Sequence, residues 1–146
     1  MEILTIDRIR LAATAEDKMD AIRKAGELLV KSGCVKPAYV QGMLNREQTM
    51  STYLDNRVAI PHGRYEDRDN ILKTGISILQ LREGVVWEED ETAHLIVGIA
   101  ASSDEHIDIL TALSEVVEDD EIVDELIHTS DANLFLSHLR KPQPQD

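Results

Sequence analysis

The hydrophobic and polar positions along this chain predict five strands. Apolar residues that alternate with polar ones, or that form a short uninterrupted run, are typical of β-strands. Such segments occur at residues 9–13, 58–60, 75–81, 85–87 and 94–100. Glu83 and Gly84 predict a turn between the third and fourth of these strands. The last strand is apolar throughout, which indicates that it is covered on both faces.

Apolar residues at helical spacing predict two helices between the first and second strands. Thr14 has the side chain of an N-cap, and Gly33 stands where a helix commonly ends in a left-handed residue. Pro37 suits the first turn of the second helix, which we expect to end near residues 46–48. Arg46 therefore lies in or near the last turn of that helix.

A third long helix is predicted after the last strand, where Ser102 and Glu105 have the spacing of a capping box. Two shorter helices follow around residues 121–127 and 131–139. Strands and helices interleave with short connections, which predicts a layered α/β fold with helices on both faces of one sheet. The 146 residues have the size of one domain, so we expect a single domain at residues 1–141 and a disordered tail at residues 142–146.

Composition limits the class of protein. The chain is 42% hydrophobic and 29% charged, which is ordinary for a globular domain. Cys34 is its one cysteine, which excludes an intramolecular disulfide and fits a reducing compartment. No apolar run approaches the ~20 residues that span a bilayer, and the first residues lack the layout of a signal peptide. We therefore expect a cytoplasmic protein that does not insert into a membrane.

The net charge of −13 is unevenly distributed. Residues 83–125 contain 15 acidic residues and no Lys or Arg, whereas residues 1–82 contain 13 basic and 11 acidic residues. This charge argues against nucleic acid as a partner, because binding to phosphodiesters is driven by a basic surface. The acidic half either keeps the protein soluble or steers a basic partner protein toward it.

His62 is the most informative candidate for chemistry. The sequence has no phosphate-cradling loop, no dinucleotide fingerprint, no H-E-x-x-H and no G-x-S-x-G, so the common nucleotide, zinc-protease and serine-hydrolase motifs are absent. His62 stands between Pro61 and Gly63 directly after a buried strand, which places it on rigid backbone at a strand end. A neutral imidazole is a nucleophile that needs no activating base. The alternative is an ordinary turn histidine, because Pro-His-Gly alone is a weak motif.

His106 and Arg46 are the other candidates. His106 falls in the first turn of the helix after Ser102, where the helix dipole disfavours imidazolium and where anions commonly bind. Arg46 has a planar guanidinium that holds two phosphate oxygens at once. Either residue is also compatible with a solvated position at a helix end. A metal site built from His62, His94 and His106 lacks the tight spacing of known metal motifs, so we expect no metal and no cofactor.

Six ordered motifs resemble a known family over nearly the whole chain. They are Met43-Leu44-Asn45-Arg46-Glu47, Thr52-Tyr53-Leu54, Val58-Ala59-Ile60-Pro61-His62-Gly63, Leu72-Lys73-Thr74-Gly75, Leu95-Ile96-Val97-Gly98-Ile99-Ala100-Ala101 and Asp104-Glu105-His106-Ile107. The chain resembles the mannitol/fructose-type enzyme IIA of the bacterial phosphoenolpyruvate-dependent sugar phosphotransferase system, closest to its mannitol branch. The resemblance implies a mixed five-stranded sheet flanked by helices.

The same resemblance implies roles for the candidate residues. His62 matches the histidine that accepts a phosphoryl group from the phosphohistidine of HPr and passes it to a cysteine of enzyme IIB, which serves the membrane component IIC. His106 matches the second active-site histidine, and Arg46 matches the arginine that assists transfer. One departure is Arg57, which stands where relatives more often have a small or acidic residue and which affects the loop before His62.

Three alternatives stay open at the level of sequence. Nitrogen-type IIA proteins share the fold and the histidine but regulate partners, and the chain shows no attached IIB or IIC segment that would exclude this function. A metal-dependent hydrolase is a more distant alternative. Mannitol is the favoured sugar, but fructose or another polyol is not excluded, because sugar specificity resides mainly in IIB and IIC.

Overall fold

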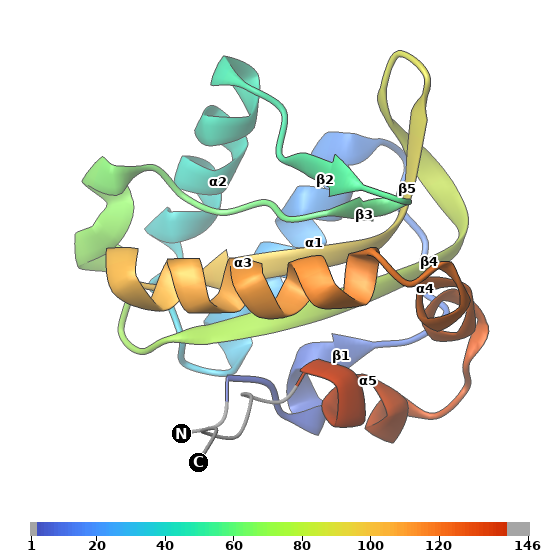
Figure 1. Ribbon diagram of the computed structural model, residues 1–146. Helices are drawn as coiled ribbons and strands as arrows, with labels where there is room; N and C mark the ends of the chain where they lie inside the picture. The colour runs from blue at the N-terminus through green and yellow to red at the C-terminus, as the bar shows by residue number, and fades with distance from the viewer. Residues whose placement is uncertain (1–2, 140–146) are drawn as a thin grey trace.

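The computed structural model describes residues 3–139, so the predicted tail at residues 142–146 lies outside the described residues. Within them, five strands form one mixed sheet in the order β1-β4-β5-β3-β2 (Figure 1). The strands are β1 (Ile9–Arg10), β2 (Tyr53–Asp55), β3 (Val58–Ala59), β4 (Gly75–Glu88) and β5 (Glu91–Ala100). β1 and β3 run parallel to their neighbours β4 and β5, whereas the β4–β5 and β2–β3 pairs are antiparallel. The mixed five-stranded sheet is therefore confirmed.

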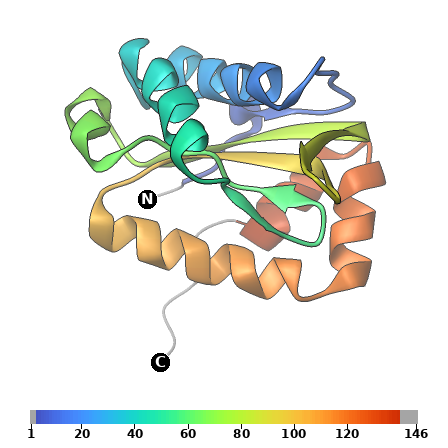
Figure 2. The same ribbon diagram turned by 90° about the horizontal axis from the view of Figure 1, so that it is seen from above.

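Helices cover both faces of this sheet (Figure 2). One face holds α1 (Lys18–Lys31) and α2 (Ala38–Thr49), and the other holds α3 (Ser103–Val117), α4 (Asp120–His128) and α5 (Ala132–Leu139). Two short 3-10 helices complete the described elements, η1 (Ile6–Arg8) and η2 (Tyr65–Asn70). The three-layer α/β prediction is confirmed.

The central strand β5 shows why the sheet has two cores. Val97 and Ile99 pack on the side of α3, whereas Ile96 and Ala100 pack on the side of α1 and α2. Side chains of a strand alternate between its faces, so a strand that is apolar at every position needs a cover on each face. The uninterrupted apolar run predicted this arrangement.

The turn predicted at residues 83–84 is wrong, because β4 continues through it. Gly84 has a φ of 77°, and the pairing with β5 shifts register between Gln80 and Val85. A Cβ on Gly84 would lie 2.7 Å from Cε1 of His94, and at this φ any side chain would also strain the backbone. A glycine of positive φ suits a bulge as well as a turn. The chain reverses instead at residues 89–90, inside the acidic run.

The first helix begins later than predicted. Thr14 is not its N-cap; Asp17 is, and its carboxylate accepts a backbone N–H of the first turn at 2.8 Å. The backbone N–H groups of Ala12 and Ala13 each donate to Gln80 of β4 at 2.8 Å. These bonds hold the chain beside the sheet, so the helix cannot start at Thr14.

Helix α1 ends, and helix α2 begins, near the residues predicted from the sequence. Gly33 follows α1 with a φ of 80°, as expected of a helix-ending glycine. Pro37 is the N-cap of α2, and the helix continues to Thr49, slightly beyond its predicted end. Arg46 lies in the last turn, as predicted.

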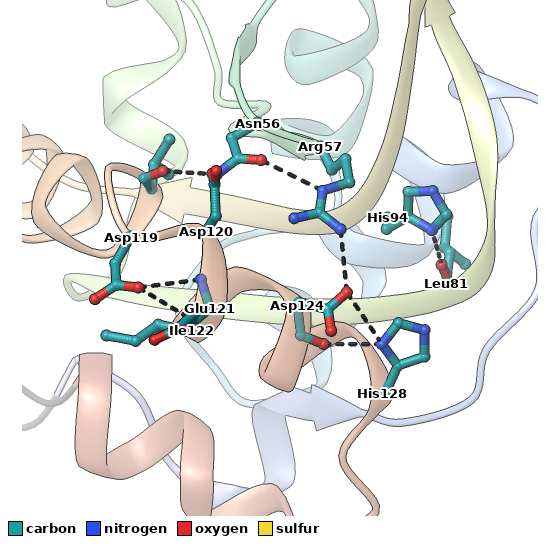
Figure 3. A network of polar contacts seen from close by, with 11 residues as sticks. Asn56, Arg57, Leu81, His94, Asp119, Asp120, Glu121, Ile122, Asp124 and His128 are labelled. Carbon is teal, nitrogen blue, oxygen red and sulfur yellow. Dashed lines mark hydrogen bonds and ion pairs between the residues drawn. The ribbon is translucent and has the colours of Figure 1, made fainter.

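Arg57 lies in the turn between β2 and β3 (Figure 3). Asn56 and Arg57 have φ values of 49° and 71°, which form a tight reversal. The Asn56 amide donates to the carbonyl of Val117 at 2.8 Å and to Asp120 at 2.7 Å. The Arg57 guanidinium lies 3.4 Å from a carboxylate oxygen of Asp124. Asn56 thus ties this turn to α3 and α4, and Arg57 ties it to α4, at the opposite end of β3 from His62.

Candidate functional site

His62 follows β3 and is held beside β5. It forms a parallel bridge with Ile99, whose N–H donates to the carbonyl of Pro61 at 3.0 Å. The Nδ1 atom of His62 lies 2.8 Å from the carbonyl oxygen of Ile60. A carbonyl only accepts, so this contact assigns the proton to Nδ1 and leaves a lone pair on Nε2. The imidazole is therefore oriented with one nucleophilic nitrogen.

Tyr39 of α2 holds the turn after His62. Its hydroxyl accepts the N–H of Gly63 at 2.9 Å and donates to the carbonyl of Ile99 at 2.8 Å. A Cβ on Gly63 would lie 2.6 Å from a ring carbon of Tyr39, so the motif requires glycine for this packing. Burial raises the pKa of Tyr39 to about 12, so the hydroxyl keeps its proton. The sequence analysis missed Tyr39, because a tyrosine inside a helix has no signal that separates it from core residues.

His106 lies against His62. The two ring centroids are 4.8 Å apart, and the ring planes meet at 63°. His106 belongs to the first turn of α3, where its backbone N–H donates to the carbonyl of Ser102 at 2.8 Å. The predicted capping box is wrong in one respect: the Ser102 hydroxyl donates to the Glu105 carboxylate at 3.0 Å instead of accepting a backbone N–H of the helix. Thr74 of the loop before β4 also donates to Glu105, which ties this turn to the sheet.

Arg46 completes the site from the side of α2. One of its terminal nitrogens donates to the carbonyl of Met50 at 2.6 Å, which holds the guanidinium at the end of the helix. The charge of Arg46 acts on both imidazoles, and it opposes protonation of each. The structure therefore brings together all three predicted residues.

Both imidazoles are held in the neutral form. Burial, followed by the neighbouring His106 and Arg46, lowers the pKa of His62, although the bond to Ile60 and the charge of Glu47 partly oppose this. Burial and Arg46 also lower the pKa of His106. A neutral His62 is a nucleophile, and a neutral His106 is a hydrogen-bond donor toward an anion.

An open pocket surrounds these side chains, and its surface is richer in cations than the chain as a whole. Among the residues that line it are Arg46, His62, Arg64, Arg68, Lys73 and His106. The cations come from the first half of the chain, where the sequence is not acidic. An anion bound at His62 therefore meets positive charge in a protein whose net charge is −13.

His94 and His128 do not line this pocket. Figure 3 shows the polar contacts that they make instead. His94 in β5 places Nδ1 3.0 Å from the carbonyl of Leu81, and His128 in α4 places Nδ1 2.9 Å from the carbonyl of Asp124. Within residues 3–139, no group of three or more His, Cys, Asp or Glu side chains is arranged to hold a metal ion. In the same part of the chain, no helix combines the length and apolar character that a membrane span needs.

An α/β domain that presents an oriented, neutral imidazole beside a second imidazole and a guanidinium has the parts of a histidine phosphocarrier. The sequence matches the family described as phosphoenolpyruvate-dependent sugar phosphotransferase system, EIIA 2, over residues 2–141. The chain belongs to this family, whose members are phosphotransferase components.

Similar sequences occur within much longer proteins. The chain is 44% identical over 138 residues, 93% of its length, to the PTS system mannitol-specific EIICBA component of Escherichia coli K12. It is 43% identical over 143 residues, 98% of its length, to a multiphosphoryl transfer protein of Xanthomonas campestris. The chain spans 22% and 17% of the length of these two relatives.

Solved structures show the same fold. The crystal structure of IIA mannitol from Escherichia coli matches with a TM-score of 0.87 and 44% identity, over 93% of this chain and 98% of that one. A complex of enzyme IIA-mannitol with phosphorylated enzyme IIB-mannitol from the same organism matches with a TM-score of 0.88 and 43% identity, over 93% of this chain and 96% of that one. The nitrogen regulatory protein IIA-Ntr of Neisseria meningitidis matches with a TM-score of 0.80 but 26% identity, over 94% and 96% of the two chains.

Proposed function

We propose that the protein is a cytoplasmic phosphocarrier that takes a phosphoryl group from phospho-HPr onto His62 and passes it to a cysteine of enzyme IIB. The sugar served by this relay is mannitol or a related polyol. The observation that carries the proposal is the bond between His62 Nδ1 and the Ile60 carbonyl, which leaves Nε2 free to attack phosphorus. Family membership and the mannitol-specific relatives support it.

The transfer to His62 is a displacement at phosphorus. The Nε2 lone pair forms a P–N bond while the P–N bond of the donor phosphohistidine breaks, and the donor imidazole leaves with the electron pair. The proton on His62 stays on Nδ1 throughout, donated to the Ile60 carbonyl. In the second transfer, the thiolate of the acceptor cysteine attacks the same phosphorus atom, and His62 leaves as a neutral imidazole.

The protein contributes to such a transfer mainly by positioning the reacting groups and by stabilising the charge of the phosphoryl group. A phosphoryl group on His62 brings about two negative charges into the pocket at neutral pH. His106 is placed to donate a hydrogen bond to a phosphoryl oxygen, since its ring lies against that of His62. Arg46 supplies the positive charge, and of its N–H groups only one on Nη1 has an acceptor among the described residues.

The relatives favour sugar uptake over regulation. Identity to the mannitol-specific EIICBA component and to IIA mannitol of Escherichia coli is 43–44%, whereas identity to the nitrogen regulatory protein is 26%. No observation on this chain therefore favours a nitrogen-type regulatory function over sugar uptake.

The test is phosphorylation with purified components. The chain is incubated with phosphoenolpyruvate, enzyme I and HPr, and its intact mass is measured before and after mild acid. We expect one acid-labile phosphate, located on His62 by fragmentation, that is lost when a mannitol-specific IIB domain is added. A phosphate at another residue, or none, contradicts the proposal.

A second expectation concerns the acidic half of the chain. Asp104 and Glu105 line the pocket beside His106, and the helices that follow add further exposed carboxylates. If residues 83–125 steer a basic donor, the rate of transfer from phospho-HPr falls as salt rises from low to physiological ionic strength. Quenched transfer reactions at several salt concentrations measure this rate, and a rate that is indifferent to salt contradicts the steering hypothesis.

A further inference from the structure

Glu47 is a buried carboxylate next to Arg46. Its side chain has no exposed surface, yet it lies in the last turn of α2, one residue from the arginine of the site. The carboxylate accepts hydrogen bonds from the backbone N–H of Thr52 at 3.1 Å, the Thr52 hydroxyl at 2.5 Å and the indole N–H of Trp87 at 3.0 Å. The Lys18 ammonium, at 3.5 Å, is its one ion-pair partner among the described residues.

A continuous path of hydrogen bonds leads from Glu47 to His62. Thr52, bound to Glu47, accepts the N–H of Ile60 on its own carbonyl at 2.9 Å. The carbonyl of Ile60 in turn accepts the Nδ1–H of His62 at 2.8 Å. Thr52 and Ile60 are both buried, so solvent does not compete for the bond between them. The carboxylate thus anchors the segment whose carbonyl orients the nucleophile.

The charge of Glu47 also reaches the site. Charges away from water are weakly screened, so a buried carboxylate acts over a longer distance than an exposed one. Lys18 offsets this charge only in part, because 29% of its side chain is exposed. The charged and titratable groups that act on His62 are His106, Arg46 and Glu47, and of these Glu47 alone favours the positive ring. The phosphorylated side chain carries a net charge of about −1, because the ring keeps its proton on Nδ1 and gains one positive charge while the phosphoryl group is dianionic. The carboxylate of Glu47 therefore disfavours the phosphorylated form relative to the neutral ring.

We propose that Glu47 is a positioning residue for phosphoryl transfer, which holds the Ile60 carbonyl through Thr52 and whose buried negative charge limits how tightly His62 retains the phosphoryl group. The inference rests on the proposed function. A carrier must release what it accepts, and a fixed negative charge behind the acceptor lowers the stability of the phosphorylated form. Arg46 and Glu47, adjacent in sequence, then act in opposite directions on the same group.

The first experiment exchanges the charge for a neutral side chain of the same shape. Glu47→Gln is mixed with phospho-HPr, and the equilibrium ratio of the two phosphorylated proteins is read by intact mass. We expect the equilibrium constant to rise roughly threefold in favour of the phosphorylated chain. The pKa of His62, measured by NMR titration of the unphosphorylated protein, should fall in the same variant. Damage to structure alone gives the reverse, a lower phosphorylated fraction.

The second experiment leaves Glu47 in place and removes the positive charge of its partly exposed partner, Lys18. Lys18→Gln removes the partner of Glu47 without altering a buried group, and Lys31→Gln, in the exposed last turn of the same helix, is the matched control. Loss of Lys18 should raise the pKa of His62 and lower the equilibrium constant, whereas loss of Lys31 should change neither.

The outcomes separate this inference from the proposed function. If the unaltered chain takes no phosphate on His62, the phosphocarrier function fails. If it does, but Glu47→Gln leaves the equilibrium unchanged or lowers it in folded protein, the inference about Glu47 is overturned. Should Glu47→Gln not fold, a Lys18→Gln equilibrium constant equal to that of Lys31→Gln overturns it on its own.

Discussion

Replacing His62 by Gln is expected to abolish phosphoryl acceptance. The glutamine side chain would fill a similar volume, but its amide nitrogen has no lone pair able to form a P–N bond. The variant therefore lacks the nucleophile. His106 does not substitute, because the bond that fixes one ring nitrogen and frees the other belongs to His62. The expected result is no gain in mass with phosphoenolpyruvate, enzyme I and HPr, and no transfer to IIB. Thermal unfolding should remain close to that of the unaltered chain, since His62 is only half-buried and lines an open pocket rather than packing in either core.

The matched control is His128→Gln. His128 is exposed on α4, and within residues 3–139 the polar contacts of its ring are with the Asp124 carbonyl and carboxylate of the same helix. This variant should accept one phosphate at the rate of the unaltered chain. Acid-labile phosphate on His62→Gln, or its loss from His128→Gln, would show that the nucleophile has been wrongly assigned.

Much of the site could be predicted because its signals are local in sequence. A proline, a histidine and a glycine directly after a buried strand placed His62 at a strand end, and the structure holds it there beside Ile99. Helix-end signals placed Arg46 and His106 in terminal turns. The local signals could not supply that these turns meet; at the level of sequence only the family resemblance implied it. The parallel pairing of β3 with β5 brings the turn at His62 beside the start of α3, which carries His106.

The residues that were missed act through contacts far apart in the chain. Tyr39 bonds Gly63, and Glu47 bonds Trp87, across 24 and 40 residues. Neither pair has a periodic or capping signal, since the bonds exist only after the layers assemble. The same holds for Gln80, whose bonds to residues 12–13 delay the start of α1 beyond the predicted Thr14. Tertiary hydrogen bonds thus overrode a local propensity.

β2 was missed for a different reason. Its three residues are too short for alternation to be visible, and the turn that follows is made by Asn56 and Arg57 at positive φ. Asparagine is enriched at positive φ, but arginine is not, so the pair lacks the usual Asn-Gly signal of a hairpin. The bonds from Asn56 to α3 and α4 explain how this turn is held without glycine.

Replacing His106 by Ala is expected to slow phosphoryl transfer roughly 10²-fold while leaving the final extent of phosphorylation measurable. The neutral ring is placed to donate to the phosphoryl oxygens as the group moves between nitrogen atoms, and alanine removes that donor from the transition state. Rapid-quench measurement of transfer from phospho-HPr gives the rate, and the phosphate should still be found on His62. The effect should fall on the rate constant at saturating donor more than on the donor concentration needed for half-saturation.

Two further variants of His106 distinguish hydrogen-bond donation to the phosphoryl group from simple packing against His62. His106→Asn keeps an N–H donor near the same position, so it should recover part of the lost rate, whereas His106→Leu fills the space without a donor and should not. Burial of the imidazole matters as well, because it lowers the pKa of His106 and keeps its ring neutral as the pH falls toward 6.5, the ordinary value for histidine. Rates for His106→Leu that equal those of His106→Asn would show that the ring serves His62 by contact and not by hydrogen bonding.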